Sequence, residues 1–450
     1  MKASRATRAL ALCLGITATL SAAGCSSLVS LFEPHPTTAT QEQSGYALPT
    51  PAPPTFTNRA AWVRKPLVDA PVEISNWGVL TVTEGVVDRS ATRSATEDID
   101  TYSAMLVSAQ DGDAKWETNS FFSTTMPRVR MVKIGPQPWA IVVAREKDES
   151  FTIRAFNALG PSIVDTYDYH NTLNPSSSVS VKGKNGKAPG VVITDSAILV
   201  TKLHDSDAAI FDPASGALTP VEPIVVKGEN PGAVVAAFDG SIVVTEFSAG
   251  GYAVSSPQGG WTAPTPQGAK REGATVLQAN HRLIVSSWQA SDSSKFFRVA
   301  LHRVDSATPL ATATVSAEDM AALENIKPRL VVSQDGRTVA LGNVIFNMDT
   351  KTGEAFDLHG ATASAIAQGV LYARGAMSPL SPTESSESPA SQSTSTPAPA
   401  QFNGDIALDL ATKTPLTGTY GMVPIGFSST GDGIFAPRQA PEEIYSIAVK

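Results

Sequence analysis

Cysteine is almost absent from this sequence, which contains only Cys13 and Cys25. Cys13 lies in an N-terminal segment that we expect to be removed during export. A mature chain that keeps only Cys25, at its very start, can form no internal disulfide and has no cysteine cluster for zinc. We therefore exclude a disulfide-stapled fold, and we expect the lone cysteine to be acylated rather than to serve in redox chemistry.

Charged residues are also scarce: they make up 17% of the chain, and the formal net charge is −8. Such a chain has little basic surface to neutralise phosphate groups, so we predict no nucleic-acid partner. Glycine (33 residues) and proline (32 residues) are abundant by contrast. Together with a hydrophobic content of 42%, this composition favours a large all-β chain with many turns.

Catalytic and metal-binding motifs are missing as well, because HExxH, CxxC and GxSxG do not occur. No two of the six histidines stand at metal-ligand spacing. The closest approaches to a metal site are the polar clusters 97–100, 165–170 and 204–207. Each fits a solvated loop or a sheet edge better than a ligand set. We predict no catalytic residue, no metal and no cofactor, and hence that the protein is not an enzyme.

A positively charged N-terminus precedes an apolar run at residues 9–23, which is too short to span a bilayer comfortably. The run ends in Ala22-Ala23-Gly24-Cys25. This resembles a bacterial lipoprotein signal, in which the cysteine becomes the lipidated first residue of the mature chain. The resemblance implies a signal peptide over 1–24, palmitate-type acylation of Cys25, and a place on the extracytoplasmic side of the cell membrane. The alternative is ordinary cleavage near Ala22 or Ala23 and a freely secreted product.

Two segments have the composition of disordered chain. Residues 25–58 are rich in Pro and Thr and lack apolar periodicity, so we predict a flexible tether that carries the lipid anchor. Residues 377–402 are rich in Ser, Thr and Pro, and we predict a disordered insertion in a loop of the folded body. The folded body itself is predicted over 59–450.

A turn motif recurs along the body: a short apolar strand, an Asp, two residues, a Ser or Thr, a Gly and a second strand. We place its copies at Asp212 with Gly216, Asp349 with Gly353, and Asp409 with Lys413 at the glycine position. The Asp side chain is expected to bond to nearby backbone and the glycine to accept a positive φ.

The copies recur about every 40–50 residues, with several short strands in each interval, which is typical of β-propeller blades. We predict a single all-β propeller of eight four-stranded blades, or seven as the alternative. The second blade takes residues 162–169 as its outermost strand. The last blade has three strands of its own, and we expect residues 60–68, with Trp62, to complete it beside 444–449 and so close the ring.

The repeat resembles that of pyrroloquinoline-quinone-type (quinoprotein-like) β-propellers, which read apolar strand, Asp, two residues, Thr-Gly, then Trp. The Asp and Gly positions named above match it, and so do Trp116 and Trp261. In that family the Asp and Trp positions mainly join neighbouring blades, which implies a structural role here, and we extend this role to Trp62. The quinone enzymes of the family carry an adjacent-cysteine disulfide and calcium ligands. Neither is recognisable in this chain, so we expect no quinone cofactor.

Among such propellers, the chain is most similar to the propeller lipoprotein of the outer-membrane barrel-assembly machinery and its relatives. That resemblance implies a non-catalytic scaffold, monomeric and lipid-anchored, that binds an envelope or membrane protein through its loops. The alternative is a small-ligand-binding or hydrolytic propeller with its site at the central channel.

Overall fold

The computed structural model describes the residues 45–67, 70–85, 100–160, 172–184, 188–203, 207–239, 241–257, 259–375, 404–417, 420–437 and 443–450. The predicted signal peptide, the acylation site Cys25 and the whole of the insertion 377–402 lie outside these ranges. So do 97–99, 165–170 and 204–206, which carry most of the weak metal candidates.

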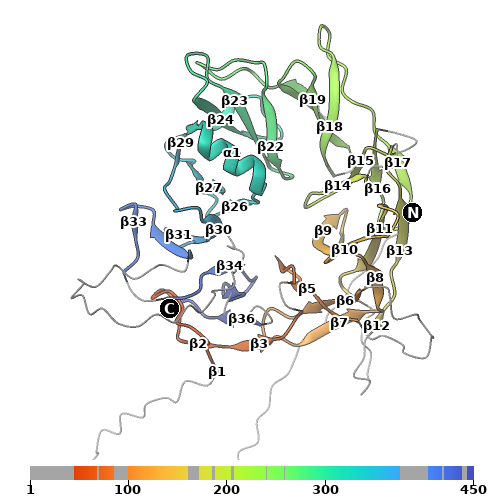
Figure 1. Ribbon diagram of the computed structural model, residues 1–450, viewed down its shortest axis with the longest axis vertical. Coiled ribbons are helices and arrows are strands. Elements are labelled where there is room, and N and C mark those ends of the chain that lie inside the picture. Colours follow the sequence, from red (N-terminus) through yellow and green to blue (C-terminus); the bar gives the residue numbers. More distant parts are fainter. Residues whose placement is uncertain are drawn as a thin grey trace, which may run out of the picture. The chain divides into compact units, whose positions relative to one another are not determined.

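The described chain is all-β in architecture, with one α-helix among its described elements, and most of its sheets have four antiparallel strands. The strands of the first half follow in chain order (Figure 1). Sheet by sheet they are β4 (Glu73–Ser75), β5 (Gly78–Glu84), β6 (Asp100–Val107) and β7 (Ala114–Thr118), with β8 (Phe121–Ser123) and β12 (Thr172–Leu173) attached; β9 (Arg128–Ile134), β10 (Gln137–Arg145), β11 (Phe151–Asn157) and β13 (Ser177–Val181); β14 (Gly190–Ile193), β15 (Ile198–Thr201), β16 (Ala208–Phe211) and β17 (Leu218–Pro220); and β18 (Pro231–Phe238), β19 (Ile242–Phe247), β20 (Tyr252–Ser255) and β21 (Trp261–Thr262).

The second half repeats the pattern. Its strands are β22 (Thr275–Ala279), β23 (Leu283–Gln289), β24 (Phe296–Arg303) and β25 (Pro309–Ser316); β26 (Leu330–Val332), β27 (Thr338–Leu341), β28 (Val344–Asn347) and β29 (Thr352–Ala355); β30 (Thr362–Ala367), β31 (Val370–Arg374), β32 (Ile406–Asp409) and β33 (Thr414–Pro415); and β34 (Pro424–Phe427), β35 (Gly433–Phe435) and β36 (Ile444–Ile447). β25 and β29 pair in parallel, which joins two four-stranded groups into one eight-stranded sheet.

Each group of strands packs its face against the next group. Between the β4–β7 and β9–β13 sheets, for example, Leu80 and Trp116 share a core cluster with Val142 and Phe156. Because a central strand such as β10 is covered on both faces by neighbouring sheets, its sequence is apolar almost without a break rather than alternating. Similar clusters follow at the later junctions. A further cluster packs Ile434 and Ile444 of the last sheet against residues of β5 and β6.

An N-terminal strand supplies the outer edge of the last sheet. β3 (Trp62–Arg64) pairs antiparallel with β36, with Trp62 opposite Ser446 and Arg64 opposite Ile444. This is the strand pairing that the sequence predicts for residues 60–68. The sheet therefore draws its four strands from both ends of the described chain.

The prediction of a flexible tether through residue 58 is wrong for its last dozen residues. β1 (Tyr46–Ala47) pairs with β2 (Arg59–Ala60). Phe56 is 2% exposed and packs edge-on against Phe435, with 5.0 Å between ring centroids. The Pro- and Thr-rich composition pointed to extended chain, but Phe56 packs in a hydrophobic core and backbone bonds such as Thr57 N–H to the Ala448 carbonyl (2.9 Å) hold the stretch beside the C-terminal strand.

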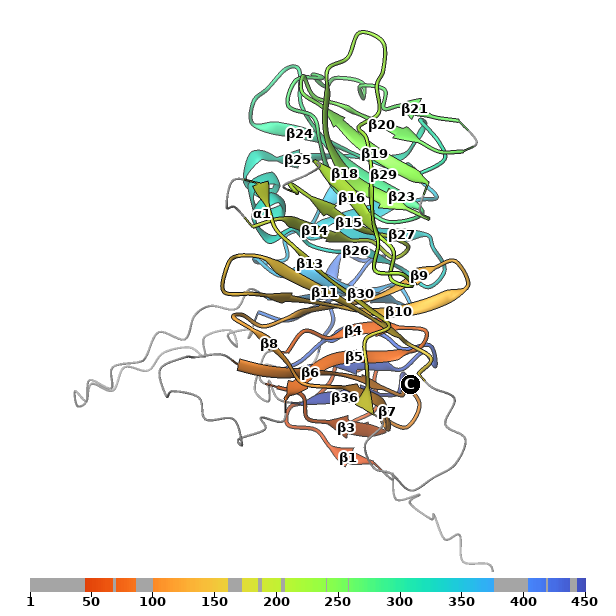
Figure 2. The ribbon, with the colours of Figure 1, turned by 90° about the vertical axis from the view of Figure 1, so that its right-hand side faces the viewer.

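The outermost strand of the second sheet is β13, whereas the sequence placed it at residues 162–169, which lie outside the described residues. The sequence also missed the helix α1 (Ala317–Ile326), which contacts β24 and β25 (Figure 2). The helix begins at Ser316, whose side chain accepts a hydrogen bond from the Asp319 N–H at 3.1 Å. It ends at Lys327, which adopts a left-handed conformation with φ of 50°. A Ser-x-x-Asp pair before a run rich in Ala, Met, Leu and Glu was the signal for it.

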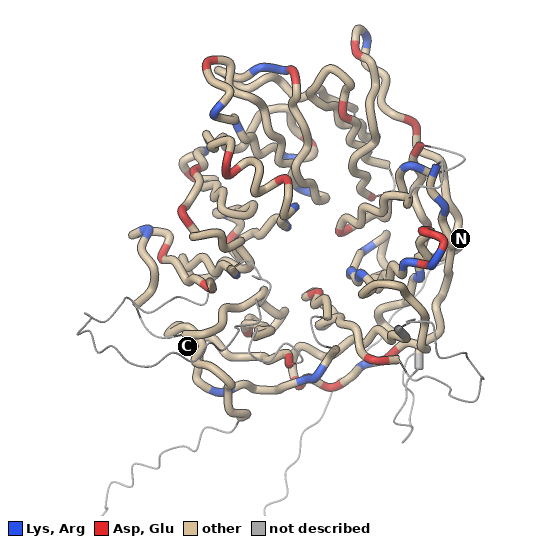
Figure 3. The backbone as a smooth tube through the Cα atoms, in the orientation of Figure 1, with Lys and Arg blue, Asp and Glu red and all other residues tan. Residues whose placement is uncertain are grey.

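Charged residues of both signs are spread over the described chain rather than segregated (Figure 3).

Candidate functional site

Two of the predicted turns have the geometry that the sequence implies. The Asp212 carboxylate accepts hydrogen bonds from the Ala214 N–H (3.0 Å) and the Ser215 hydroxyl (2.5 Å), and Gly216 has φ of 76°. The Ser215 hydroxyl, followed by the backbone donor, holds the pKa of the Asp212 carboxyl below its usual value. These bonds fix the turn between β16 and β17 and leave the carboxylate occupied by its own loop.

At the Asp409 turn a lysine takes the place of glycine. The carboxylate accepts from the N–H groups of Ala411 (2.8 Å) and Thr412 (2.9 Å), which lowers the pKa of Asp409. Lys413 sits at φ of 58°, a conformation that a non-glycine residue adopts at a cost.

The Asp349 turn is displaced by two residues from its predicted register. The side chain that caps it is Asn347, which accepts from the N–H groups of Asp349 (2.9 Å) and Thr350 (3.1 Å). The residue with positive φ is Lys351, at 59°. Asn347 and Lys351 therefore correspond to Asp409 and Lys413 of the β32–β33 turn, and the predicted turn roles of Asp349 and Gly353 are wrong.

Gly353 instead lies within β29, at the point where that strand pairs in parallel with β25. A Cβ atom there would approach the Ala313 Cβ to 2.9 Å and the Phe346 ring to 2.6 Å. The glycine is thus required for close approach between strands rather than for a turn.

The three predicted tryptophans share one type of contact. The indole N–H of Trp116 donates to the Ala158 carbonyl (3.0 Å), that of Trp62 to Ala109 (2.9 Å), and that of Trp261 to Val304 (2.8 Å). Each tryptophan lies on the outer strand of its four-stranded group, and each acceptor follows the third strand of the next group. Their hydrogen bonds thus join neighbouring sheets, and a structural role stays our prediction for all three.

A hollow among the described residues is bordered by the edge strands of several sheets. One cavity of 830 Å³ is lined from β4, β26, β30 and β34, and an adjoining cavity of 220 Å³ is lined from β4, β9, β14, β22 and β26. These are the first strands of their four-stranded groups. Arg329 and Leu330 line both cavities, so the two spaces adjoin at these residues.

The larger cavity is mainly apolar. Its lining includes Ile74, Ile326, Val332, Ile425 and Phe427. Ile326 and Val332 are 53% and 42% exposed, so each keeps apolar surface in contact with solvent. Concave, largely apolar spaces of this size are the common form of small-ligand sites.

A three-residue charged cluster stands where the cavities adjoin. Glu73, which is 8% exposed, accepts from the Arg130 Nη1 at 3.2 and 3.0 Å and also from the Arg329 Nη1. Burial lowers the pKa of the Arg130 guanidinium, and the Glu73 carboxylate opposes that shift. With one carboxylate facing two guanidinium groups, the cluster carries one excess positive charge.

A second polar link crosses between sheets that are not neighbours. Asp195, in the β14–β15 turn, accepts from the His281 N–H (2.9 Å) and pairs with the His281 Nδ1 in the β22–β23 turn. The Arg282 Nε donates to the His281 Nε2 at 2.9 Å. The Asp195 carboxylate and both ring nitrogens of His281 have hydrogen-bond partners within this link. The link therefore stabilises the wall of the smaller cavity and is not a site for binding a ligand.

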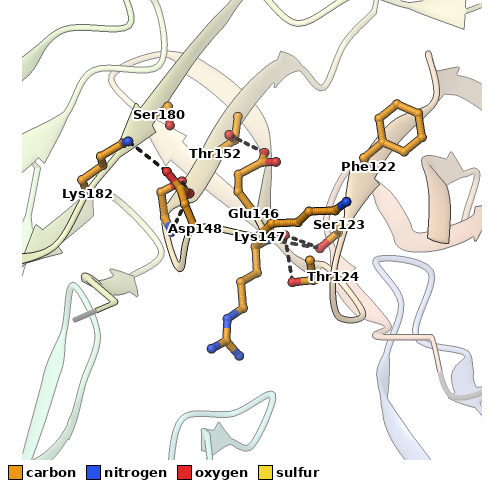
Figure 4. A pocket seen from close by; sticks show the side chains of 11 residues that line it. Phe122, Ser123, Thr124, Glu146, Lys147, Asp148, Thr152, Ser180 and Lys182 are labelled. Carbon is orange, nitrogen blue, oxygen red and sulfur yellow. Dashed lines mark hydrogen bonds and ion pairs between the residues drawn. The ribbon is translucent and has the colours of Figure 1, made fainter. Parts of the chain in front are cut away.

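A separate pocket of 540 Å³ lies on the β9–β13 sheet beside β8 (Figure 4). Lys182 points toward Asp148 with an Nζ–Oδ2 distance of 2.9 Å, and Thr152 donates to Glu146 at 2.7 Å. The Ser150 hydroxyl, followed by Lys182, lowers the pKa of Asp148. The charged side chains named here satisfy one another, which makes this pocket a weaker ligand site than the central cavities.

A buried polar cluster lies in the core between the β18–β21 and β22–β25 sheets. His302 is fully buried, and its Nδ1 is 3.0 Å from the Tyr252 hydroxyl. Its Nε2 has no hydrogen-bond partner among the described residues. Burial lowers the pKa of His302 to about 4 and raises the pKa of the Tyr252 phenol. Both groups are therefore neutral near pH 7.

Sequence reasoning missed the central cluster completely. Glu73 lies in β4, Arg130 in β9 and Arg329 directly before β26, and the three belong to no motif. The one available signal was the pair Arg128 and Arg130, on the opposite face of the strand from the buried Val129 and Met131. In the part of the chain that the structure describes, no group of three or more His, Cys, Asp or Glu side chains is arranged to hold a metal ion. No helix among these residues is long and apolar enough to cross a membrane.

No protein-family model matches the chain, and no curated protein matches it by sequence. Among solved structures, Raptor from Chaetomium thermophilum is 12% identical, with a TM-score of 0.35 over 71% of this chain and 28% of that one. Hsv2 from Kluyvelomyces marxianus is also 12% identical, with a TM-score of 0.35 over 69% of this chain and 89% of that one. The U3-55K structure is 13% identical, with a TM-score of 0.33 over 70% of this chain and 91% of that one. The chain thus spans less than a third of Raptor. The propeller-type architecture rests on the sheet pairings of this chain.

Proposed function

We propose that this protein is a non-catalytic, lipid-anchored propeller that acts as a scaffold for an envelope protein outside the cytoplasm. The observation that carries the proposal is the way in which the sheets are joined. Tryptophans on the last strands of three sheets reach the turns of the next sheets, and the recurrent Asp residues are used within their own loops. A body stiffened in this way holds its loops in fixed positions, which suits a binding platform.

The proposal includes a closed ring of eight blades. Eight four-stranded groups support it, counting the eight-stranded sheet as two. The β3–β36 pairing and the cluster that packs Ile444 against Val79 support closure. A closed ring of blades leaves only short sheet edges, which limits pairing with other chains through the strands.

The anchor would be an acyl group on Cys25. Since the chain is paired with a neighbouring strand from Tyr46 onward, a tether between Cys25 and Tyr46 would reach at most about 75 Å when fully extended. This is shorter than the tether expected from composition and keeps the propeller near the membrane surface.

Mass spectrometry of the N-terminal peptide tests the anchor. We expect a mature chain that begins at an acylated Cys25, and Cys25→Ala should leave the protein unacylated. A native N-terminus at Ala23 or Gly24, without lipid, would contradict the anchor and favour free secretion.

Crosslinking in intact cells tests the scaffold. The anchored protein should crosslink reproducibly to one envelope protein, and Cys25→Ala should lose that product while keeping its melting temperature. A clean monomer in both cases would contradict the scaffold proposal.

A second candidate function is binding of a small ligand at the centre of the propeller. The 830 Å³ cavity with exposed Ile326 and Val332 in its wall favours it. The first function uses the loops and the second uses the interior, so each can hold without the other.

A further inference from the structure

The larger central cavity has the size and the surface of a binding site. Its 830 Å³ lies within the range of small-ligand pockets. Ile326 and Val332 expose about half of their surface into or beside it. An apolar ligand body would remove this surface from water, which is the main source of affinity in such pockets.

The charge at its inner end is positive and accessible. The Arg329 side chain is 52% exposed, whereas that of Glu73 is 11% exposed and that of Arg130 29%. The ion pair with Glu73 engages the Nη1 of Arg329, and a guanidinium has five N–H donors. Arg329 can therefore donate to an oxyanion in the larger cavity while it still contacts Glu73.

The same cluster limits the charge of the ligand. One excess positive charge matches one carboxylate. A dianion would place its second charge near Glu73, which is buried and already faces two guanidinium groups. Across the cavity, the Arg374 Nη2 donates to the Ala436 carbonyl at 2.9 Å, so this donor is used by the wall, although the guanidinium keeps its positive charge.

We propose that the larger cavity binds a small monocarboxylate with an extended apolar chain. The carboxylate lies against Arg329, and the chain packs on Ile74, Val332, Ile425 and Phe427. This inference rests on the second candidate function and names its ligand class. It does not depend on the lipid anchor or on a protein partner.

Calorimetric titration of the purified mature chain with decanoate tests the proposal. Decanoate should bind, acetate should not bind detectably, and decanol should bind at least about tenfold more weakly, because it lacks the charge-assisted hydrogen bond to Arg329. Equal binding of decanol and decanoate, or no binding of decanoate, would overturn the proposal.

Two variants with opposite effects locate the site. Arg329→Gln should weaken decanoate binding by about tenfold or more and leave decanol binding unchanged. Glu73→Gln keeps an oxygen acceptor for the guanidinium groups but removes the competing charge, so it should strengthen decanoate binding severalfold. Arg337→Gln, at an exposed turn outside the cavity, is the matched control and should change nothing.

Val332→Asp provides a test that does not depend on the charged cluster. A second carboxylate in the apolar wall should abolish decanoate binding, with the melting temperature as the check on folding. Unchanged binding in both Arg329→Gln and Val332→Asp would place any ligand elsewhere. If a short peptide with one Glu between leucines bound more tightly than decanoate, the ligand class would be wrong even though the cavity is used. None of these results bears on the crosslinking that tests the scaffold.

Discussion

The turn at Asp212 and the cluster at Glu73 are both built around one carboxylate, but they are assembled differently. Asp212 binds groups in its own loop, the N–H of Ala214 and the hydroxyl of Ser215. Glu73 binds Arg130 and Arg329, which lie 57 and 256 positions away in the chain. The turn can form wherever its few residues are present, whereas the cluster requires several sheets to be in place at once.

This difference predicts which substitutions and deletions will reduce the stability of the fold most. A substitution that breaks one turn disturbs a single loop. A change that displaces the sheets relative to one another breaks the contacts of Glu73 with both Arg130 and Arg329. Changes that act on the two kinds of site should therefore differ in size, and in whether their effects remain local.

The largest expected effect comes from deleting residues 60–68, which removes β3 and Trp62. The deletion breaks the β3–β36 pairing, the Trp62 bond to Ala109 and a buried indole. We expect it to cost more than about 5 kcal/mol in free energy of unfolding, since burying one Trp alone contributes about 3–5 kcal/mol. Urea denaturation followed by circular dichroism measures it.

Deleting residues 378–399 is the control for this experiment and should leave the melting temperature nearly unchanged. If the two deletions had the same effect, the proposed closure of the ring by β3 would be incorrect.

The next largest effect is expected at the centre. Glu73→Ala leaves the partly buried Arg130 without its counter-charge, which should cost about 3–5 kcal/mol. Glu354→Ala breaks an exposed pair with Lys413 (Nζ–Oε1 2.5 Å) and should cost about 0.5 kcal/mol or less. Guanidinium denaturation of the two variants compares them. Similar losses would mean that the central cluster is no more than another surface ion pair.

The buried His302 predicts a pH dependence. Its pKa is lowered to about 4 in the folded chain, against about 6.5 in an unfolded one. Between these values the unfolded state binds more protons, so this contribution to stability is complete above about pH 6.5 and is lost as the pH falls toward 4. The full loss is about 3 kcal/mol.

Urea titrations between pH 4 and 7 measure this loss. His302→Phe should flatten the dependence, and His359→Gln, at an exposed turn, should not. The Asp212 and Asp409 carboxylates have lowered pKa values, so their contributions fall away only at still lower pH. An unchanged slope in His302→Phe would show that another group is responsible.

The sequence predicted much of what depends on neighbours in the chain, since apolar runs bounded by turn residues located most strands. It also predicted one long-range pairing, that of Trp62 with the C-terminal strand, because the last group of strands lacked a fourth member. The Asp212 and Asp409 turns follow from side-chain bonds within one loop. The cluster of Glu73, Arg130 and Arg329 could not be predicted from the sequence, because no local pattern indicates that Glu73 contacts Arg329, which lies 256 positions away.

Two predictions were wrong, the end of the tether and the register of the turn after β28. The first relied on composition alone and the second on one form of the turn motif. Residues 46–58 read as tether because Pro and Thr dominate them, yet Phe56 anchors the stretch in a core. The turn after β28 was read at Asp349 because Thr-Gly follows it. Alignment of FNMDTKT with LDLATKT (residues 346–352 and 408–414) would have placed Asn347 beside Asp409 in role. The matching threonine pairs, Thr350 with Thr352 and Thr412 with Thr414, are both 2.8 Å apart.

The smallest expected effect separates the two assignments of that turn. Asn347→Ala removes the acceptor for two backbone N–H groups and should cost about 1 kcal/mol, as should Asp409→Ala in the corresponding turn. Asp349→Ala loses an exposed contact to Arg337 at 3.8 Å and should stay within about 0.5 kcal/mol of the native chain. Thermal unfolding of the three variants under one set of conditions resolves the difference. If Asp349→Ala destabilised the chain more than Asn347→Ala, the turn would have the register predicted from the sequence, with Asp349 as its capping residue. Asn347 would then not correspond to Asp409.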